Sequence, residues 1–267
     1  MVVQLEPVPP APADAFTWER QSWGWLLTCT PMVPAAVHGF TTRQLAIAGG
    51  TGRSEAEWHA LAATAGVARD SVAVVTQVHG ASVVRAHARQ SGERPRADGL
   101  AGDDPRLALT VRVADCVPLL LADARRGVAA AVHAGWRGTA AGIAGAAVSL
   151  LARSFGCAPG DMVAALGPSI GACCYTVGPE LTDAFRAEGH GSAVDRWFRP
   201  GHEWLLLDLW AANCDQLVAA GVPGASVFVS GLCTACYPEW FYSYRREGAA
   251  AGRLVGFIRP SGATRRA

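Results

Sequence analysis

The middle of the chain alternates apolar runs with short polar breaks, and this pattern predicts β-strands. Three such runs cover 107–113, 117–123 and 127–132. Short apolar runs between turn residues are typical of strands that are buried on both faces. The segment between the second and third runs begins with Asp123 and ends with Gly127, which predicts a short hairpin loop.

Helical spacing of apolar residues and further strand-like runs occupy the rest of the chain. Helices are expected over 54–66, 138–155, 179–188 and from Asp208, as the N-cap, to Gly221, and strands at 71–78, 82–86, 162–166, 225–229 and 253–258. The strands at 71–78 and 82–86 are expected to meet at a turn. No internal segment resembles a linker. We therefore predict a single α+β domain at 21–267, with mixed β-sheets flanked by helices, after a proline- and alanine-rich lead at 1–20.

Charge and composition exclude several classes of partner. The 267 residues include 23 basic and 22 acidic side chains, a net charge of +1, which attracts neither nucleic acid nor an anionic membrane. No apolar run approaches the roughly 20 residues that span a bilayer. The first residues lack a basic start followed by an apolar stretch, so a secretory signal is not expected. We expect a cytoplasmic protein with reduced cysteines, either a monomer or a small homo-oligomer.

One thiol and two imidazoles are the strongest candidates for chemistry. Cys116 directly precedes the strand at 117–123, and His133 directly follows its hairpin partner. If the hairpin is centred near 124 and 125, Cys116 lies opposite His133, with Cβ atoms roughly 5 Å apart. The two side chains then bind one metal ion, most commonly zinc, or form a Cys–His nucleophile pair. His79, at the end of another predicted strand, is the natural third ligand.

An interpretation without metal binding or catalysis is equally compatible with the spacing alone. Cys116 is then a buried small apolar residue, and both histidines are core residues with satisfied hydrogen bonds. If all three bind one ion, they leave a fourth position open, as catalytic zinc sites do and structural sites do not.

Five motifs follow one another in the order found in a known family. They are Thr76-Gln-Val-His-Gly80, Ala114-Asp-Cys-Val-Pro118, Val132-His-Ala-Gly-Trp-Arg-Gly138, Leu166-Gly-Pro-Ser-Ile-Gly171 with Cys173-Cys174-Tyr175, and Phe241-Tyr-Ser-Tyr-Arg-Arg246. From about Val37 onward the chain resembles the YfiH-type laccase-domain family, described both as multicopper polyphenol oxidases and as purine nucleoside phosphorylases. The resemblance implies a single-domain fold, a nucleoside and phosphate as substrates, and His79, Cys116 and His133 as zinc ligands.

One segment departs from the family pattern. Members usually carry a Ser-Leu-Asn-Leu-Gly stretch and an acidic turn after the Thr-Arg motif, whereas here Thr42-Arg43 passes through 46–52 directly into the predicted helix. We therefore expect part of the substrate pocket to differ, with altered or narrower activity.

Phosphorolysis requires cations that hold phosphate, and Arg43 and Arg137 are the candidates. Guanidinium groups bind phosphate through two parallel hydrogen bonds. Arg137 also lies at the start of a predicted helix, where free N–H groups favour anions. The alternative for both residues is a solvated surface position.

Deamination requires a carboxylate that carries protons, and Asp115, beside Cys116, is the candidate. The slightly favoured alternative is that Asp115 accepts a hydrogen bond from a ligand histidine or a loop amide. Gln77 is a candidate for recognising a base edge, although strand alternation from His79 also allows it to point to the opposite face.

The resemblance favours a zinc-dependent purine nucleoside enzyme that combines phosphorolysis of adenosine and inosine with adenosine deamination. A copper-dependent phenol oxidase is the first alternative, but seven histidines without a His-x-His pair are too few for a multicopper site. The second alternative is hydrolytic editing of a peptidoglycan precursor by Cys116 or by metal-activated water. A purely structural zinc is disfavoured because it usually has four protein ligands.

Cys233 and Cys236 have the CxxC spacing of metal and redox motifs. A four-cysteine site needs a second pair, and Cys173 and Cys174 are adjacent, which is a poor arrangement for chelating one ion. Packing is therefore the favoured role for the CxxC pair.

Overall fold

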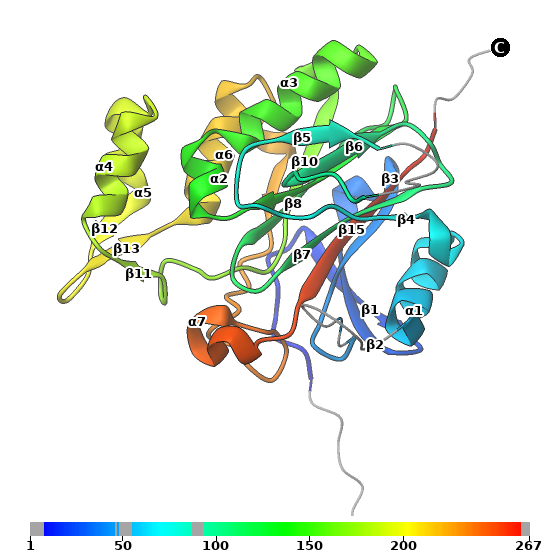
Figure 1. Ribbon diagram of the computed structural model, residues 1–267, viewed down its shortest axis with the longest axis horizontal. Coiled ribbons are helices and arrows are strands. Elements are labelled where there is room, and N and C mark those ends of the chain that lie inside the picture. The colour runs from blue at the N-terminus through cyan, green and yellow to red at the C-terminus, as the bar shows by residue number, and fades with distance from the viewer. Residues whose placement is uncertain (1–7, 46, 48–54, 87–92, 263–267) are drawn as a thin grey trace, which may run out of the picture.

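Two six-stranded β-sheets stacked face to face form the centre of the computed structural model, which describes residues 8–45, 47, 55–86 and 93–262 (Figure 1). In spatial order, the first sheet contains β1 (Phe16–Gln21), β2 (Gly24–Cys29), β3 (Ala36–Thr41), β15 (Leu254–Pro260), β7 (Ala108–Val113) and β4 (Val72–Ala73). The second contains β14 (Val227–Val229), β10 (Met162–Leu166), β8 (Val117–Asp123), β9 (Val128–Ala134), β6 (Gly99–Gly102) and β5 (Val83–Arg85). A small third sheet contains β11 (Thr176–Val177), β13 (Leu205–Leu207) and β12 (Phe198–Pro200).

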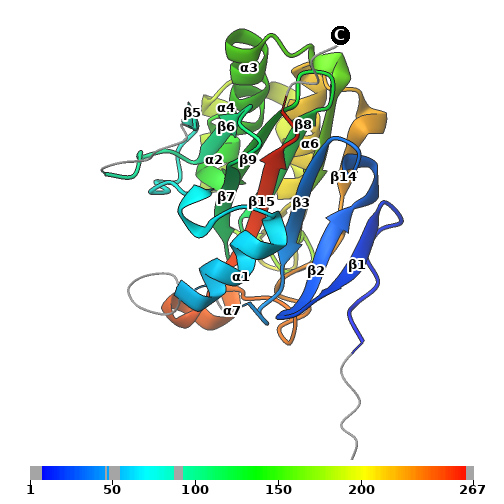
Figure 2. The ribbon, with the colours of Figure 1, turned by 90° about the vertical axis from the view of Figure 1, so that its right-hand side faces the viewer.

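Helices cover the outer face of each large sheet (Figures 1 and 2). The α-helices are α1 (Glu55–Ala65), α2 (Trp136–Ala140), α3 (Ile143–Phe155), α4 (Glu180–Ala187), α5 (Val194–Trp197), α6 (Leu209–Ala219) and α7 (Tyr244–Glu247). Short 3₁₀ turns lie at Thr30–Met32, Arg69–Ser71, Pro159–Asp161, Gly191–Ala193, Gly224–Ser226 and Gly248–Ala250. α1 packs on the first sheet, whereas α3 and α6 pack on the second.

The apolar runs of the second sheet are explained by burial on both faces. In β8, Leu119 and Leu121 face the helices, whereas Leu120 and Ala122 face the first sheet. Because both faces are covered, every position of β8 and β9 is buried and no polar alternation remains. The predicted α+β fold with mixed sheets and a single domain is confirmed.

Several strands and helices match the sequence-based predictions closely. The strand at 162–166 is β10, and Asp208 caps α6 by accepting a hydrogen bond from the N–H of Ala211 at 3.0 Å. The lead predicted at 1–20 overlaps the first sheet, because β1 begins at Phe16 and pairs with β2 along its whole length.

Three local predictions are wrong. The strands predicted at 71–78 and 82–86 do not meet at a turn beside His79, because the first strand, β4, ends at Ala73. It pairs in parallel with β7 in the first sheet, whereas β5 pairs in parallel with β6 in the second. The helix predicted over 138–155 is two helices, α2 and α3, because Gly142 between them has a left-handed φ of 76°.

The third error is the register of the β8–β9 hairpin. Asp123 pairs with Val128, so the loop contains four residues and Pro118, rather than Cys116, lies opposite His133. The Oδ1 atom of Asp123 accepts hydrogen bonds from the N–H groups of Arg125 and Arg126 at 2.9 and 3.0 Å, which stabilises the longer loop. Cys116 therefore lies just beyond the paired strand, at the same end as His133.

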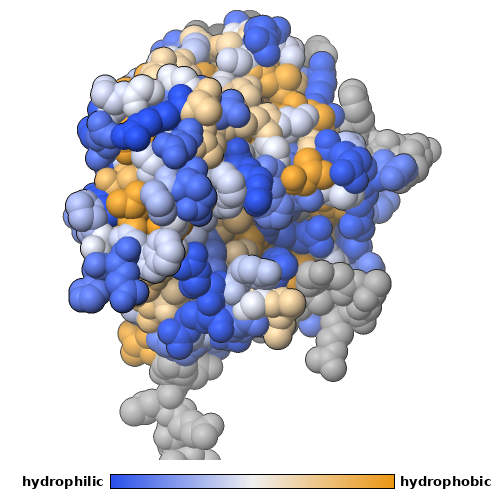
Figure 3. All heavy atoms as spheres, turned by 60° about the vertical axis from the view of Figure 1, so that its left-hand side comes forward, coloured by the Kyte–Doolittle hydropathy of each residue, from blue (hydrophilic) through white to orange (hydrophobic). Residues whose placement is uncertain are grey.

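Among the helices of the described residues, none combines the length and apolar character needed to cross a bilayer. Figure 3 shows one face of the molecule, on which hydrophilic residues surround several separate groups of hydrophobic ones.

Candidate metal-binding active site

The imidazoles of His79 and His133 and the thiol of Cys116 converge in the structure. One ligand atom from each residue lies within 4.8 Å of those of the other two, and the two ring centroids are 4.9 Å apart. His133 lies in β9 and Cys116 directly precedes β8. His79 lies in the segment between β4 and β5. The structure therefore brings together the three residues predicted as metal ligands, although the hairpin register differs from the predicted one.

A glycine in the Val132–Gly138 motif makes room for this cluster. A Cβ atom on Gly135 would lie 2.9 Å from the Cys116 sulfur and 3.4 Å from Cδ2 of His79. A side chain at this position would therefore displace a ligand.

Asp98, which the sequence reasoning missed, lies beneath the cluster and is completely buried. Its Oδ1 atom is 2.8 Å from Nδ1 of His133 and accepts a hydrogen bond from the N–H of His79 at 2.9 Å. The Oδ2 atom accepts from the N–H of Gly80 at 2.7 Å. Because a carboxylate accepts hydrogen bonds, Nδ1 of His133 carries a proton, and Nε2 is the nitrogen that can bind a metal once it gives up its own proton.

Electrostatics at the cluster favour an ionised carboxylate and thiolate. Burial raises the pKa of Asp98, but hydrogen bonds from His133 and from the amides of Gly80 and His79 lower it below its usual value. Burial likewise raises the pKa of Cys116, whereas the charge and hydrogen bonds of His133 and His79 lower it to about 6. Burial lowers the pKa of His133, but the Cys116 thiolate and Asp98 raise it to about 9.

The candidate ligand His79 and Asp115, which precedes the ligand Cys116, have backbone conformations that non-glycine residues rarely adopt. His79 has a φ of 59° and Asp115 a φ of 82°. Such left-handed conformations cost on the order of 1–3 kcal/mol each and persist where the surroundings enforce them. For His79 the constraint is the amide hydrogen bond to Asp98, and for Asp115 it is a hydrogen bond from the N–H of Ile170 to its carbonyl at 2.9 Å.

The carboxylate of Asp115 connects loops that are distant in sequence. Its Oδ1 atom accepts a hydrogen bond from the Thr234 hydroxyl and its Oδ2 atom accepts one from the N–H of Arg245, both at 2.6 Å. The alternative considered from sequence was a hydrogen bond from a ligand histidine or a loop amide, whereas the donors found are a hydroxyl and an amide of the first turn of α7.

A pocket of about 620 Å³ opens over the three candidate ligands. It is lined by Gln77, His79, Arg112, Val113, Ala114, Asp115, Cys116, His133, Trp136, Arg137, Ile170, Tyr175, Leu209, Tyr244, Arg245 and Arg253. The volume lies within the range of small-molecule sites. Four arginines and one carboxylate among these residues give the pocket a positive balance.

Among the predicted phosphate-binding arginines, only Arg137 lines the pocket. Arg43 donates hydrogen bonds to the carbonyl of Pro238 and, at 3.3 Å, to Glu247, and its guanidinium lies 4.6 Å from the Tyr242 ring centroid. Arg43 thus anchors the segment that leads to α7. The shortened stretch after it, at 46–52, falls largely outside the described residues.

Gln77 lines the pocket, but its amide is already engaged. It donates to the carbonyl of Arg112 at 2.8 Å and accepts from the N–H of the same residue at 2.9 Å. Gln77 therefore fixes the backbone of Arg112, a pocket arginine that sequence reasoning did not single out.

Residues 52–261 match a family described as multi-copper polyphenol oxidoreductase laccase. The chain belongs to this family. It is 33% identical over 269 residues to the purine nucleoside phosphorylase YlmD of Geobacillus stearothermophilus, covering 90% of this chain and 96% of that protein. It is also 42% identical over 148 residues to adenosine deaminase RL5 from an unknown prokaryotic organism, covering 55% and 56% of the two chains.

A solved structure agrees with this assignment. The crystal structure of the hypothetical protein YfiH of Bacillus licheniformis superposes with a TM-score of 0.82 at 30% identity, and the match covers 93% of this chain and all of that one. The resemblance stated from the five motifs is therefore confirmed, and this laccase-family chain has the YfiH fold.

With zinc as the probe ion, replacing Asp98 by alanine should weaken the affinity of the candidate site for metal 10- to 100-fold, because His133 loses the carboxylate that orients its ring. The dissociation constant is measured by competition with a chromogenic chelator, and circular dichroism checks folding. Asp103→Ala, which removes an exposed carboxylate paired with Arg85, is the matched control. Equal zinc affinity in Asp98→Ala and wild type would contradict the role assigned to Asp98.

In the metal-free protein, the Cys116 thiolate should form around pH 6 rather than in the range of an ordinary cysteine, about 8.5. Because the pKa is lowered, the thiolate signal disappears as the pH falls through this midpoint. It is measured as the difference in ultraviolet absorbance between wild type and Cys116→Ser. His133→Gln should move the midpoint upward, and an unchanged midpoint in that variant would show that His133 is not the cause.

Proposed function

We propose that this chain is a zinc-dependent purine nucleoside enzyme that cleaves adenosine and inosine with phosphate and also deaminates adenosine. The observation that carries the proposal is the composition of one pocket. His79, Cys116 and His133 meet there beside four arginines and beside aromatic side chains. The names of the relatives support the same class of reaction.

The three candidate ligands fit a catalytic zinc ion. Imidazole nitrogen and thiolate sulfur are preferred zinc donors, and three of them leave one coordination position open. Asp98 adds the carboxylate that commonly orients a zinc-bound histidine. When bound, zinc supplies a Lewis acid at the pocket wall and lowers the pKa of water.

Copper remains the alternative metal, since histidine and cysteine also bind copper. The candidate metal clusters among the described residues include two histidines in total, His79 and His133. A multicopper oxidase needs more histidines, so membership of a family described as multi-copper oxidoreductases does not decide the reaction of this chain.

Arg112 and Arg137 are the residues that we assign to phosphate. No described residue accepts a hydrogen bond from either guanidinium; that of Arg137 lies 4.3 Å from the Trp136 ring centroid. Burial and the positive charges of Arg94 and Arg253 lower the pKa of Arg112. A bound phosphate would relieve this repulsion between cations and would satisfy the guanidinium donors.

Trp136, Tyr175 and Tyr244 supply flat apolar surfaces for a purine. Aromatic rings stack on nucleobases with little dependence on base identity, so the same pocket accommodates adenosine and inosine. Gln77 is not assigned to the base, because its amide already pairs with the backbone of Arg112.

In phosphorolysis, a phosphate oxygen forms a bond to C1′ of the ribose while the C1′–N9 bond breaks. The electron pair of that bond leaves with the base, which takes up one proton, and the sugar leaves as ribose 1-phosphate. Arg112 and Arg137 hold the phosphate against a sugar that gains positive charge in the transition state. In deamination, water adds at C6 of the purine and ammonia departs.

Asp115 is the proposed proton carrier for the departing group. It is the one carboxylate among the described residues that line the pocket. Each of its oxygens accepts one hydrogen bond, from Thr234 or Arg245, and retains a second lone pair for a proton.

The eight cysteines form no disulfide in the structure, and the cytoplasmic location stays the prediction made from sequence. The oligomeric state stays the prediction made from sequence, a monomer or a small homo-oligomer.

Zinc-loaded protein incubated with inosine and phosphate should yield hypoxanthine and ribose 1-phosphate, and adenosine should also yield inosine. Products are identified by mass spectrometry. Cys116→Ala should reduce turnover at least 100-fold, because removal of one of three ligands disrupts the metal site. Without phosphate the base should not be released. Absence of both reactions in zinc-loaded wild type would refute the proposal.

The Arg112→Met variant distinguishes a specific loss of phosphate binding from a general loss of structure. We expect its KM for phosphate to rise more than tenfold, while the rate of adenosine deamination stays within about twofold, since deamination uses no phosphate. Arg85→Met, which removes an exposed arginine paired with Asp103, is the matched control and should leave both constants unchanged. An unchanged phosphate KM in Arg112→Met would remove Arg112 from the phosphate site.

A further inference from the structure

A second cluster of possible metal ligands lies at the carboxyl ends of β10 and β14. These two strands are parallel neighbours, with Ala164 beside Val227 and Leu166 beside Val229. Neighbouring parallel strands end at the same edge of a sheet, so the loops that follow them lie together. The first loop carries Cys173 and Cys174.

The second loop, which follows β14, carries Cys233 and Cys236, and backbone hydrogen bonds hold the two loops in register. The N–H of Thr234 donates to the carbonyl of Ser169 at 2.9 Å, and the N–H of Ser169 donates to the carbonyl of Leu232 at 3.3 Å. Two segments more than 60 residues apart in sequence therefore have a fixed relative position.

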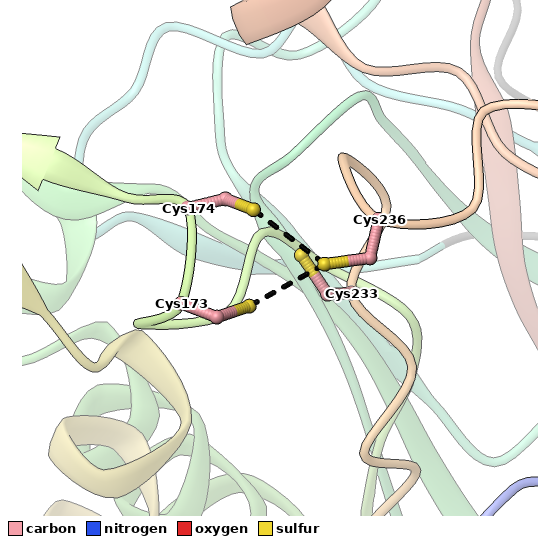
Figure 4. Close-up of side chains that lie close together, drawn as sticks. All are labelled: Cys173, Cys174, Cys233 and Cys236. Carbon is pink, nitrogen blue, oxygen red and sulfur yellow. Dashed lines mark hydrogen bonds between the residues drawn. The ribbon is translucent and has the colours of Figure 1, made fainter.

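All four cysteine sulfurs meet between the loops, as Figure 4 shows. Each Sγ atom lies within 4.8 Å of the other three. The Cys236 sulfur is 3.6 Å from that of Cys173 and 3.5 Å from that of Cys174. A tetrahedral zinc ion with Zn–S bonds of about 2.3 Å places its sulfurs about 3.8 Å apart, so the observed cluster has the dimensions of such a site.

The turn after Ile170 explains how two adjacent cysteines reach one point. The N–H groups of Cys174 and Tyr175 both donate to the carbonyl of Gly171 at 3.0 Å, which curls the chain around the cluster. The adjacency of Cys173 and Cys174, the objection raised from sequence, therefore does not keep their sulfurs away from a common point. Packing alone does not describe the cluster either, because Cys173 and Cys236 are exposed.

We propose that Cys173, Cys174, Cys233 and Cys236 bind one zinc ion, distinct from the site at His79, Cys116 and His133. Four thiolates are the ligand set of closed structural zinc sites, and soft sulfur donors select zinc over magnesium or calcium. The N–H of Gly171 donates a hydrogen bond to the Cys233 sulfur at 3.3 Å, the kind of contact that supports a metal-bound thiolate. This inference does not rest on the proposed function.

A zinc ion in this position would clamp loops that build the pocket. Thr234 lies between Cys233 and Cys236 and donates to Asp115, while Tyr175 directly follows Cys174 and lines the pocket. The four-cysteine site would therefore hold the Asp115 carboxylate and one aromatic wall in place.

Metal content tests the proposal in a Cys116→Ser background, which removes a ligand of the first site. Protein reduced and then loaded with zinc, with free metal removed, should retain about one equivalent by elemental analysis. Adding Cys233→Ser and Cys236→Ser should abolish this retention. Adding Cys214→Ser, which replaces a cysteine of α6 outside both clusters, should leave it unchanged.

Cobalt(II) provides a second readout that does not depend on enzymatic activity. In the Cys116→Ser background it should give strong sulfur-to-cobalt charge-transfer bands and the visible bands of tetrahedral coordination. If the double serine variant does not fold, Cys173→Ser serves instead, with three thiolates left and an expected loss of metal affinity of at least tenfold.

Three outcomes would overturn the proposal. One is that the reduced Cys116→Ser protein retains no metal, and another is that metal persists after Cys233 and Cys236 are replaced. The third concerns protein purified without reductant, whose mass would be lower by two hydrogen atoms than that of the reduced protein, while the reduced protein still takes up no zinc. That result would identify a disulfide pair instead. None of these outcomes decides whether the zinc-loaded wild type cleaves inosine with phosphate, which is measured separately.

Discussion

The buried carboxylate of Asp98 is the contact on which the candidate site depends. It accepts hydrogen bonds from the His133 ring and from the backbone of His79 and Gly80, and so ties the segment after β4 to the end of β9. An isolated buried carboxylate is costly, but this one has a donor at each oxygen and next to it an imidazole with a raised pKa. The left-handed conformation of His79 is maintained by the same interaction.

The stacked sheets supply the rigid frame around this contact. Strands β7, β8 and β9 bring Arg112, Cys116 and His133 to one end of the sandwich, while the loops after β10 and β14 close the pocket beside them. Asp115 joins those loops to the ligand segment through Thr234 and Arg245. The pocket is therefore positioned by long-range pairing, and the four cysteines lie where that pairing brings two loops together.

Sequence reasoning succeeded where local pattern decides the structure. Continuous apolar runs predicted β8 and β10 because those strands are buried on both faces, and Asp208 marked the start of α6 because its side chain caps the first turn. The predicted hairpin register was wrong by two residues. A hairpin centred near 124 and 125 would place Cys116 opposite His133, but the hydrogen bonds of the Asp123 carboxylate stabilise a four-residue loop that places Pro118 there.

Asp98, Arg112 and the four-cysteine cluster could not be found in the same way. Asp98 is a single acidic residue in a small-residue stretch, and its partners are His79 and His133, distant in sequence. The cysteines become a cluster only because β10 and β14 pair in parallel.

The most direct test of the candidate metal site is anomalous X-ray scattering at the zinc edge from crystals grown with zinc. We predict a peak bounded by His79 Nδ1 or Nε2, Cys116 Sγ and His133 Nε2; an ordered cluster with no anomalous density among these atoms would contradict the account.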